Sequence, residues 1–174
     1  MTDSSIEAIS PKAVAAALSR VRAQRPLVQC ITNDVVQEIT ANVLLAAGMS
    51  PAMVPAPEEA AAFAQFAADA LLCNVGTPSE ENSRGMKLAA ATMSEAGKPW
   101  TLDPVGAGAS KLRTETAQKL LEEVKFTVIR GNISEVKTLA SGSGTTKGVD
   151  ADVADKVSEE NLDSAVAFAK AFAE

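Results

Sequence analysis

The chain has 174 residues, of which 47% are hydrophobic and 22% charged, and its formal net charge is −6. This length and composition are typical of one ordinary globular domain with a full core, so we treat residues 1–174 as a single domain. The negative charge and the lack of any Lys/Arg run argue against a nucleic-acid partner. The sequence shows no signal peptide and no apolar segment of membrane length, so we expect a cytoplasmic protein without a membrane partner.

The two cysteines, Cys30 and Cys73, each lie inside an apolar, strand-like run. This placement favours free thiols in a reducing compartment. A catalytic role is disfavoured for both, because the chain contains no histidine that could activate a thiolate.

Strand and helix patterns alternate from the start of the chain. Residues 1–9 are polar and expected to be disordered, and Ser10-Pro11 is a typical helix start. The apolar run Leu27–Ile31 predicts a strand that is covered on both faces. Thr32-Asn33-Asp34 predicts a turn, and the helix that follows is expected to end at Gly48.

The helix before Gly48 carries two further signals. Asp34 is the expected N-cap, and Gln37 three residues later would complete a capping box. Apolar residues recur at three- and four-residue steps and form one stripe: Val36, Ile39, Val43 and Ala47. A second short strand is expected to end at Val54.

The alternation continues to the end of the chain. Strands are expected at 70–75, 100–102 and 126–129. A helix is expected at 58–69, with Ala61, Phe63 and Phe66 available for packing, and another from a capping box at Thr77 to about Ala96. Further helices are expected near 114–124, after Asn132, and at 161–172. Residues 141–148 are rich in Ser, Gly and Thr and are expected to form a flexible loop. The pattern predicts an α/β fold with a mainly parallel sheet and crossover helices.

Asp103 is the first candidate for chemistry, because it ends an apolar strand and precedes Pro104. Proline holds the preceding residue in an extended conformation, and a carboxylate at a strand end is a suitable ligand for Mg²⁺. The alternative is an Asp-Pro turn without a function.

The second candidate site is the segment from Arg130 to Glu135. Asn132 and Glu135 have the spacing of a capping box, which needs no ligand, but a carboxylate at a helix start could serve both purposes. Arg130, followed by Gly131, is suited to bind polyphosphate through paired N–H donors, although a surface arginine is the simpler interpretation.

Five motifs occur in order between Pro26 and Asp150: Ile-Thr-Asn-Asp, Ser-Pro-Ala-Met-Val, Asn-Val-Gly-Thr, Trp-Thr-Leu-Asp-Pro-Val and Ile-Arg-Gly-Asn-x-Ser-Glu. In this combination the chain resembles the hydroxyethylthiazole kinase family of the ribokinase-like superfamily. One departure is Gln29, where the family usually has histidine. Another is the Gly-Ala-Gly loop after Asp-Pro-Val.

The resemblance implies a ribokinase-like three-layer fold and ATP- and Mg²⁺-dependent phosphorylation of the hydroxyethyl group of 4-methyl-5-(2-hydroxyethyl)thiazole. It also implies a homotrimer with the substrate site between subunits. The roles that it carries over are Mg²⁺ binding by Asp103 and Glu135, ATP binding by Arg130 and Asn132, and thiazole binding by Met53 and Asn33.

The family's later half, with its glycine-rich anion site and catalytic cysteine, has no counterpart here, so we expect a domain truncated on its C-terminal side. No catalytic residue is assigned. The alternative function is therefore a thiazole-binding remnant or regulatory module without turnover. A different ribokinase-like enzyme is opposed by Ser-Pro-Ala-Met-Val, and a Rossmann oxidoreductase by the absence of Gly-x-Gly-x-x-Gly after the first strand.

Overall fold

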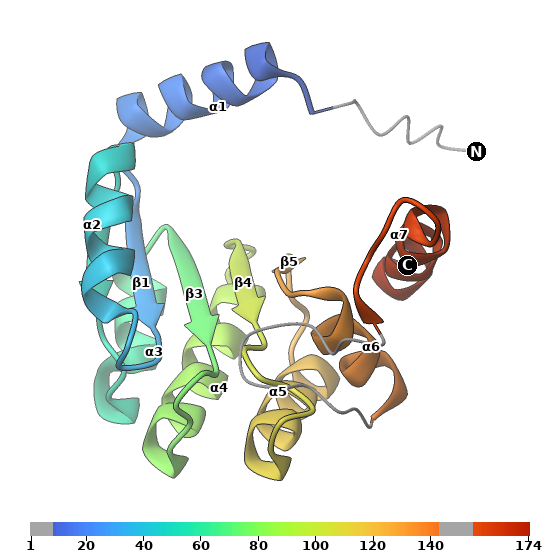
Figure 1. Ribbon diagram of the computed structural model, residues 1–174. Helices are drawn as coiled ribbons and strands as arrows, with labels where there is room; N and C mark the ends of the chain where they lie inside the picture. The colour runs from blue at the N-terminus through green and yellow to red at the C-terminus, as the bar shows by residue number, and fades with distance from the viewer. Residues whose placement is uncertain (1–8, 143–154) are drawn as a thin grey trace.

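The computed structural model describes residues 9–142 and 155–174. Its centre is a sheet of five parallel strands in the order β2-β1-β3-β4-β5, flanked by helices (Figure 1). The strands are β1 (Leu27–Ile31), β2 (Ser50–Met53), β3 (Ala70–Asn74), β4 (Trp100–Asp103) and β5 (Val128–Ile129). The helices are α1 (Pro11–Gln24), α2 (Gln37–Ala47), α3 (Pro57–Phe66), α4 (Glu80–Glu95), α5 (Lys111–Glu123), α6 (Ile133–Ser141) and α7 (Leu162–Ala173). The predicted parallel α/β fold is confirmed.

One face of the sheet forms the main hydrophobic core. The parallel register places Ile31 beside Cys73 and Leu71 beside Trp100, and all four side chains are almost inaccessible. Helices α3, α4 and α5 cover this face, largely through small residues: Ala60, Ala64, Ala89, Ala90 and Ala117. The alanine-rich composition therefore lets the helices approach the sheet closely.

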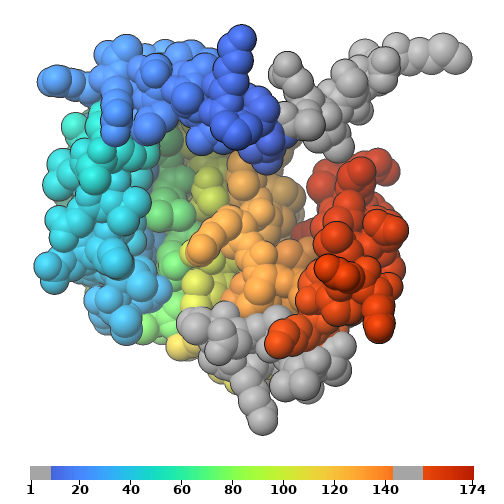
Figure 2. All heavy atoms as spheres, turned by 45° about the horizontal axis from the view of Figure 1, so that its top comes forward, coloured from blue at the N-terminus to red at the C-terminus, as the bar shows by residue number. Residues whose placement is uncertain are grey.

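The opposite face is covered only in part, and we call it the open face. Cys30 is buried and α2 packs beside the neighbouring β2, but Leu72 is only half-buried and Val128 is 48% exposed. In the space-filling view this face lies in a hollow between α2 and the residues that follow β5 (Figure 2). The apolar stripe of α2 is not buried either, since Ile39 and Val43 are 61% and 60% exposed.

The start of α2 differs from the predicted capping box. The helix begins at Gln37, and its N-cap, Val36, makes no capping bond through its side chain. The turn is closed instead by Asn33, whose Oδ1 accepts hydrogen bonds from Val35 N (3.0 Å) and Val36 N (3.2 Å). Asp34 accepts only a long hydrogen bond from Gln37 Nε2 (3.4 Å). The Asx turn of Asn33 therefore closes this turn in place of the predicted Asp34 cap.

The start of α4 is also displaced from its prediction. Ser79, and not Thr77, is the N-cap, and its hydroxyl accepts a hydrogen bond from Asn82 N (3.0 Å). Thr77 Oγ1 accepts from Asp34 N (3.0 Å) and so joins the loops after β1 and β3. The tertiary hydrogen bond between Thr77 and Asp34 thus replaces the predicted capping box. The prediction that Phe66 is available to pack α3 is also wrong, because that side chain is 86% exposed.

Helix α6 ends at Gly142, whose positive φ of 77° suits a glycine C-cap. Residues 143–148 of the expected loop, like residues 1–8 of the expected disordered start, lie outside the described residues. Asp155 joins α6 to the segment before α7, because its carboxylate accepts hydrogen bonds from Ser134 Oγ (2.9 Å) and Lys137 Nζ (2.6 Å). In the part of the chain that the structure describes, no helix is both long and apolar enough to cross a bilayer.

Candidate functional site

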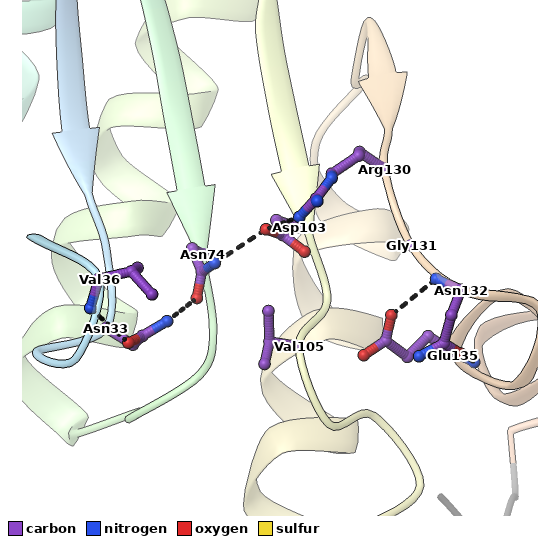
Figure 3. Close-up of a pocket in the computed structure, with 9 residues that line it drawn as sticks. All are labelled: Asn33, Val36, Asn74, Asp103, Val105, Arg130, Gly131, Asn132 and Glu135. Atoms are coloured by element: carbon purple, nitrogen blue, oxygen red, sulfur yellow. Dashed lines mark hydrogen bonds and ion pairs between the residues drawn. The ribbon is translucent and has the colours of Figure 1, made fainter. Parts of the chain in front are cut away.

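Loops at the carboxyl ends of the strands surround a polar cavity of about 460 Å³ (Figure 3). Open α/β sheets bind small ligands at this edge, because the strands stop there and the loops diverge. The cavity is lined by Asn33, Val36, Asn74, Asp103, Val105, Arg130, Gly131, Asn132 and Glu135. Five of the six predicted site residues are therefore brought together: Asn33, Asp103, Arg130, Asn132 and Glu135.

A chain of hydrogen bonds connects the strand ends across this cavity. Asn33 Nδ2 donates to Asn74 Oδ1 (2.8 Å), and Asn74 Nδ2 donates to Asp103 Oδ2 (2.8 Å). Arg130 Nη1 donates to the same Asp103 oxygen from the far side (2.9 Å). The parallel register, which pairs Asn74 with Asp103, aligns these side chains along one edge.

Asp103 is a buried carboxylate with an exposed partner. Its side chain is 8% accessible, whereas that of Arg130 is 76% accessible. Burial raises the pKa of Asp103, and the Arg130 charge and the hydrogen bonds from Arg130 and Asn74 oppose that shift. Because Arg130 is so exposed, solvent screens the ion pair and its contribution to stability is small.

Glu135 is held by backbone groups at the start of α6. Its Oε1 accepts from Gly106 N (2.9 Å) and its Oε2 from Asn132 N (2.9 Å), while Asn132 Oδ1 accepts from Glu135 N (3.0 Å). The predicted capping box is thus confirmed. Burial raises the pKa of Glu135, the two N–H donors lower it, and the charge of Asp103 raises it further. Glu135 combines a structural role with a position in the cavity wall.

Asp103 and Glu135 are the two cavity residues that could hold a divalent cation. Within residues 9–142 and 155–174, no group of three or more His, Cys, Asp or Glu side chains forms a metal cluster. Mg²⁺ is usually bound by only one or two carboxylates and completes its shell with water and phosphate oxygens. Asp103 Oδ1 accepts no hydrogen bond from the described residues, so it has lone pairs free for such a ligand.

Met53 is the predicted site residue that lies outside the cavity. It ends β2, the edge strand farthest from β5, where it is half-buried and paired with Cys30. Gln29, which replaces the family's histidine, also lies elsewhere. It is fully buried on the core face, where its Nε2 donates to the carbonyl oxygens of Val54 and Ala60 (both 3.2 Å).

Asn74 is the residue whose importance sequence reasoning underestimated. It begins the Asn-Val-Gly-Thr motif but was not assigned to the site. The available signal was its position, since it directly follows an apolar strand just as Asp103 does. Its contact with Asp103 depends on β3 and β4 being neighbours, which the sequence did not show.

The fold and cavity define the chain as an α/β protein with a candidate ligand site at the carboxyl edge of a parallel sheet. A model of the hydroxyethylthiazole kinase family matches residues 18–172. The chain belongs to the hydroxyethylthiazole kinase family, and the resemblance found in its motifs is confirmed.

Individual relatives agree with this assignment. The chain is 51% identical over 155 residues to a hydroxyethylthiazole kinase of Clostridium acetobutylicum, covering 89% of this chain and 56% of the relative. It is 52% identical over 144 residues to one of Klebsiella pneumoniae, covering 83% and 55%. A solved structure of a hydroxyethylthiazole kinase protein from Pyrococcus horikoshii OT3 matches with a TM-score of 0.71 at 44% identity, covering 75% of this chain and 51% of that one. The chain spans about half the length of the relatives that it matches.

Proposed function

We propose that the protein takes part in ATP-dependent phosphorylation of the hydroxyethyl group of 4-methyl-5-(2-hydroxyethyl)thiazole, in thiamine biosynthesis and salvage. The observation that carries this proposal is the convergence of Asp103, Arg130 and Glu135 on one strand-end cavity in a member of this family. Phosphoryl transfer depends mainly on positioning and on neutralising phosphate charge, and a guanidinium together with a Mg²⁺ ion held by carboxylates would supply that neutralisation.

Arg130 and Asn132 are the proposed contacts to ATP. One Arg130 nitrogen is held by Asp103, and most of the guanidinium is accessible, so further N–H donors can meet phosphate oxygens. Asn132 borders the same cavity, and its Oδ1 caps α6. Its contact with ATP must therefore be compatible with the cap.

Asp103 and Glu135 are the proposed carboxylates for Mg²⁺. When bound with ATP, the ion would offset the negative charge of the phosphates. The protein's own contribution is to hold both carboxylates in place, Asp103 through side-chain donors and Glu135 through backbone N–H groups.

Asn33 and Met53 are the proposed contacts to the thiazole. Asn33 uses its Oδ1 for two backbone donors and one N–H for Asn74, so the donor left for a ligand is its second N–H. Met53 lies on the edge strand, which supports a thiazole pocket extending past the cavity toward a neighbouring subunit of a homotrimer. The two buried free thiols support a reducing, cytoplasmic location.

The test is steady-state kinetics of Asp103→Asn with Mg-ATP and hydroxyethylthiazole, made in a version of the chain extended with a family-like C-terminal half. We expect kcat to fall at least ~10²-fold, as for the loss of a charged group that acts in the transition state. The midpoint of thermal unfolding should change little, because asparagine keeps an acceptor for Asn74 and Arg130. Asp163→Asn, on the surface of α7, is the matched control and should have ordinary kinetics. Unaltered kinetics in Asp103→Asn would show that Asp103 is only a turn residue without a function.

The second candidate function is thiazole binding without turnover. It is favoured by the lining of the cavity. Among the ionisable residues that line it, only Asp103 and Glu135 can accept a proton, and both are already proposed to hold Mg²⁺. Calorimetry with hydroxyethylthiazole, beside an assay for ADP release, separates the two functions. Binding without ADP release would support this candidate for the 174-residue chain.

A further inference from the structure

Asn74 occupies the centre of the strand-end network and has no role in the function proposed above. It is 6% exposed and makes three hydrogen bonds through its side chain. Its Oδ1 accepts from Asn33 Nδ2 (2.8 Å) and from Gly76 N (3.0 Å), and its Nδ2 donates to Asp103 Oδ2 (2.8 Å).

These partners permit only one orientation of the Asn74 amide. A flipped amide would point its oxygen at the Asp103 carboxylate and its NH₂ at two other N–H donors. The loop itself offers little room for change, because a Cβ on Gly76 would lie 2.6 Å from the Asn33 side chain. The donor aimed at Asp103 is therefore fixed by the surrounding structure.

Asp103 receives both of its donors on one oxygen. Asn74 and Arg130 both donate to Oδ2, while no described residue donates to Oδ1, which Figure 3 shows turned away from Asn74. The two donors differ in rigidity, because Arg130 is 76% exposed on a long side chain and Asn74 is buried on a strand end. Asn74 is the donor that sets the carboxylate's direction.

We propose that Asn74 is a positioning residue, which holds Oδ2 of Asp103 and thereby leaves Oδ1 to bind the site's ligand as a single oxygen. The nature of that ligand, a divalent cation with ATP, rests on the proposed function. The hydrogen-bond geometry does not. Groups that orient a metal-binding carboxylate in this way typically change metal affinity by about 10–100-fold when they are removed.

The first measurement uses the 174-residue chain without metal and follows the ¹³Cγ NMR signal of Asp103. We expect this signal to move in Asn74→Leu. Leucine could prevent folding, because it removes the acceptor of the Gly76 N–H group and leaves no space for a water molecule in its place. Asn74→Ala, with a smaller side chain, is therefore made as well. The control is Asn82→Leu, whose native side chain makes no hydrogen bond among the described residues. An Asp103 signal unchanged in the folded Asn74 variants would overturn the proposal.

The second measurement is the affinity for Mn²⁺ in the presence of ATP, determined by electron paramagnetic resonance. Asn74→Ala should weaken it by about 10–100-fold. In an Asp103→Asn background the same change should have an effect below about twofold, because Asn74 acts through Asp103. Equal effects in both backgrounds would show a merely structural role and overturn the proposal. If the unmutated chain binds no Mn²⁺, the proposed metal site fails, and the Asp103 signal alone then decides the role of Asn74.

Discussion

The two faces of the sheet are built from the same strands but have different environments. On the core face, Ile31, Leu71 and Leu102 are at most 2% exposed under three helices. On the open face, the neighbouring Leu72 is half-buried and Val128 is 48% exposed, and α2 leaves its own apolar stripe accessible.

The candidate site lies at the carboxyl edge of the open face. Asn74, Asp103 and Arg130 line the strand-end cavity and also border an apolar groove between α2 and the sheet. The comparison suggests that the core face supplies the stability of the domain, while the open face contributes little to it and presents the functional groups. The following predictions test that division, beginning with the largest expected effect.

Leu102→Ala on the core face should destabilise the protein by about 2–5 kcal/mol, because it leaves a cavity in a closely packed region. The measurement is urea unfolding followed by circular dichroism. Leu72→Ala makes the same chemical change on an adjacent strand of the open face, and it should cost clearly less. Equal losses would show that the two faces contribute alike.

Lys98→Met should cost about 2 kcal/mol in the same experiment. Lys98 Nζ donates to three carbonyl oxygens at the end of α3, those of Ala64 (2.9 Å), Gln65 (2.9 Å) and Ala68 (2.8 Å), and so fastens a core-face helix. Methionine keeps the packing and removes the donors. Lys12→Met in the exposed part of α1 is the control and should be almost neutral.

Stability should respond to pH with opposite signs at two aspartates. Burial raises the folded-state pKa of Asp103, so its favourable contribution is present at low pH and is lost as pH rises through that pKa. The unfolding free energy of the unmutated chain should therefore fall relative to Asp103→Asn as pH increases from 4 to 7.

Asp155 provides the contrasting case. Hydrogen bonds from Lys137 and Ser134 lower its pKa, so its contribution is present at neutral pH and is lost as pH falls through the folded-state pKa. The stability advantage over Asp155→Asn should shrink on acidification. The same sign at both positions would contradict the different causes assigned to them.

Val43→Ala in the exposed stripe of α2 should change the unfolding free energy by no more than about 0.5 kcal/mol, the usual range for surface positions. The measurement is again urea unfolding, at low protein concentration. A loss of 1 kcal/mol or more that grows with protein concentration would show that another copy of the chain covers this stripe.

Much of the fold could be predicted because its signals are local. An apolar run followed by a turn residue defined β1, β3 and β4, and the spacing of Asn132 and Glu135 alone predicted the capping box of α6. Local competition was harder to judge. Asn33 replaced Asp34 at the turn before α2, since both side chains are good acceptors and only the backbone conformation selects between them.

The sequence by itself determined the order of strands and helices along the chain and the polar residues at the strand ends, because both depend on neighbours a few positions apart. Tertiary structure decided which of those ends meet. The strand order places β2 at the edge opposite β5, so Met53 lies outside the cavity, and it sets β3 beside β4, so Asn74 holds Asp103. Contacts of this kind join residues 29 positions apart, and only the packing of the helices on the sheet brings them within hydrogen-bonding distance.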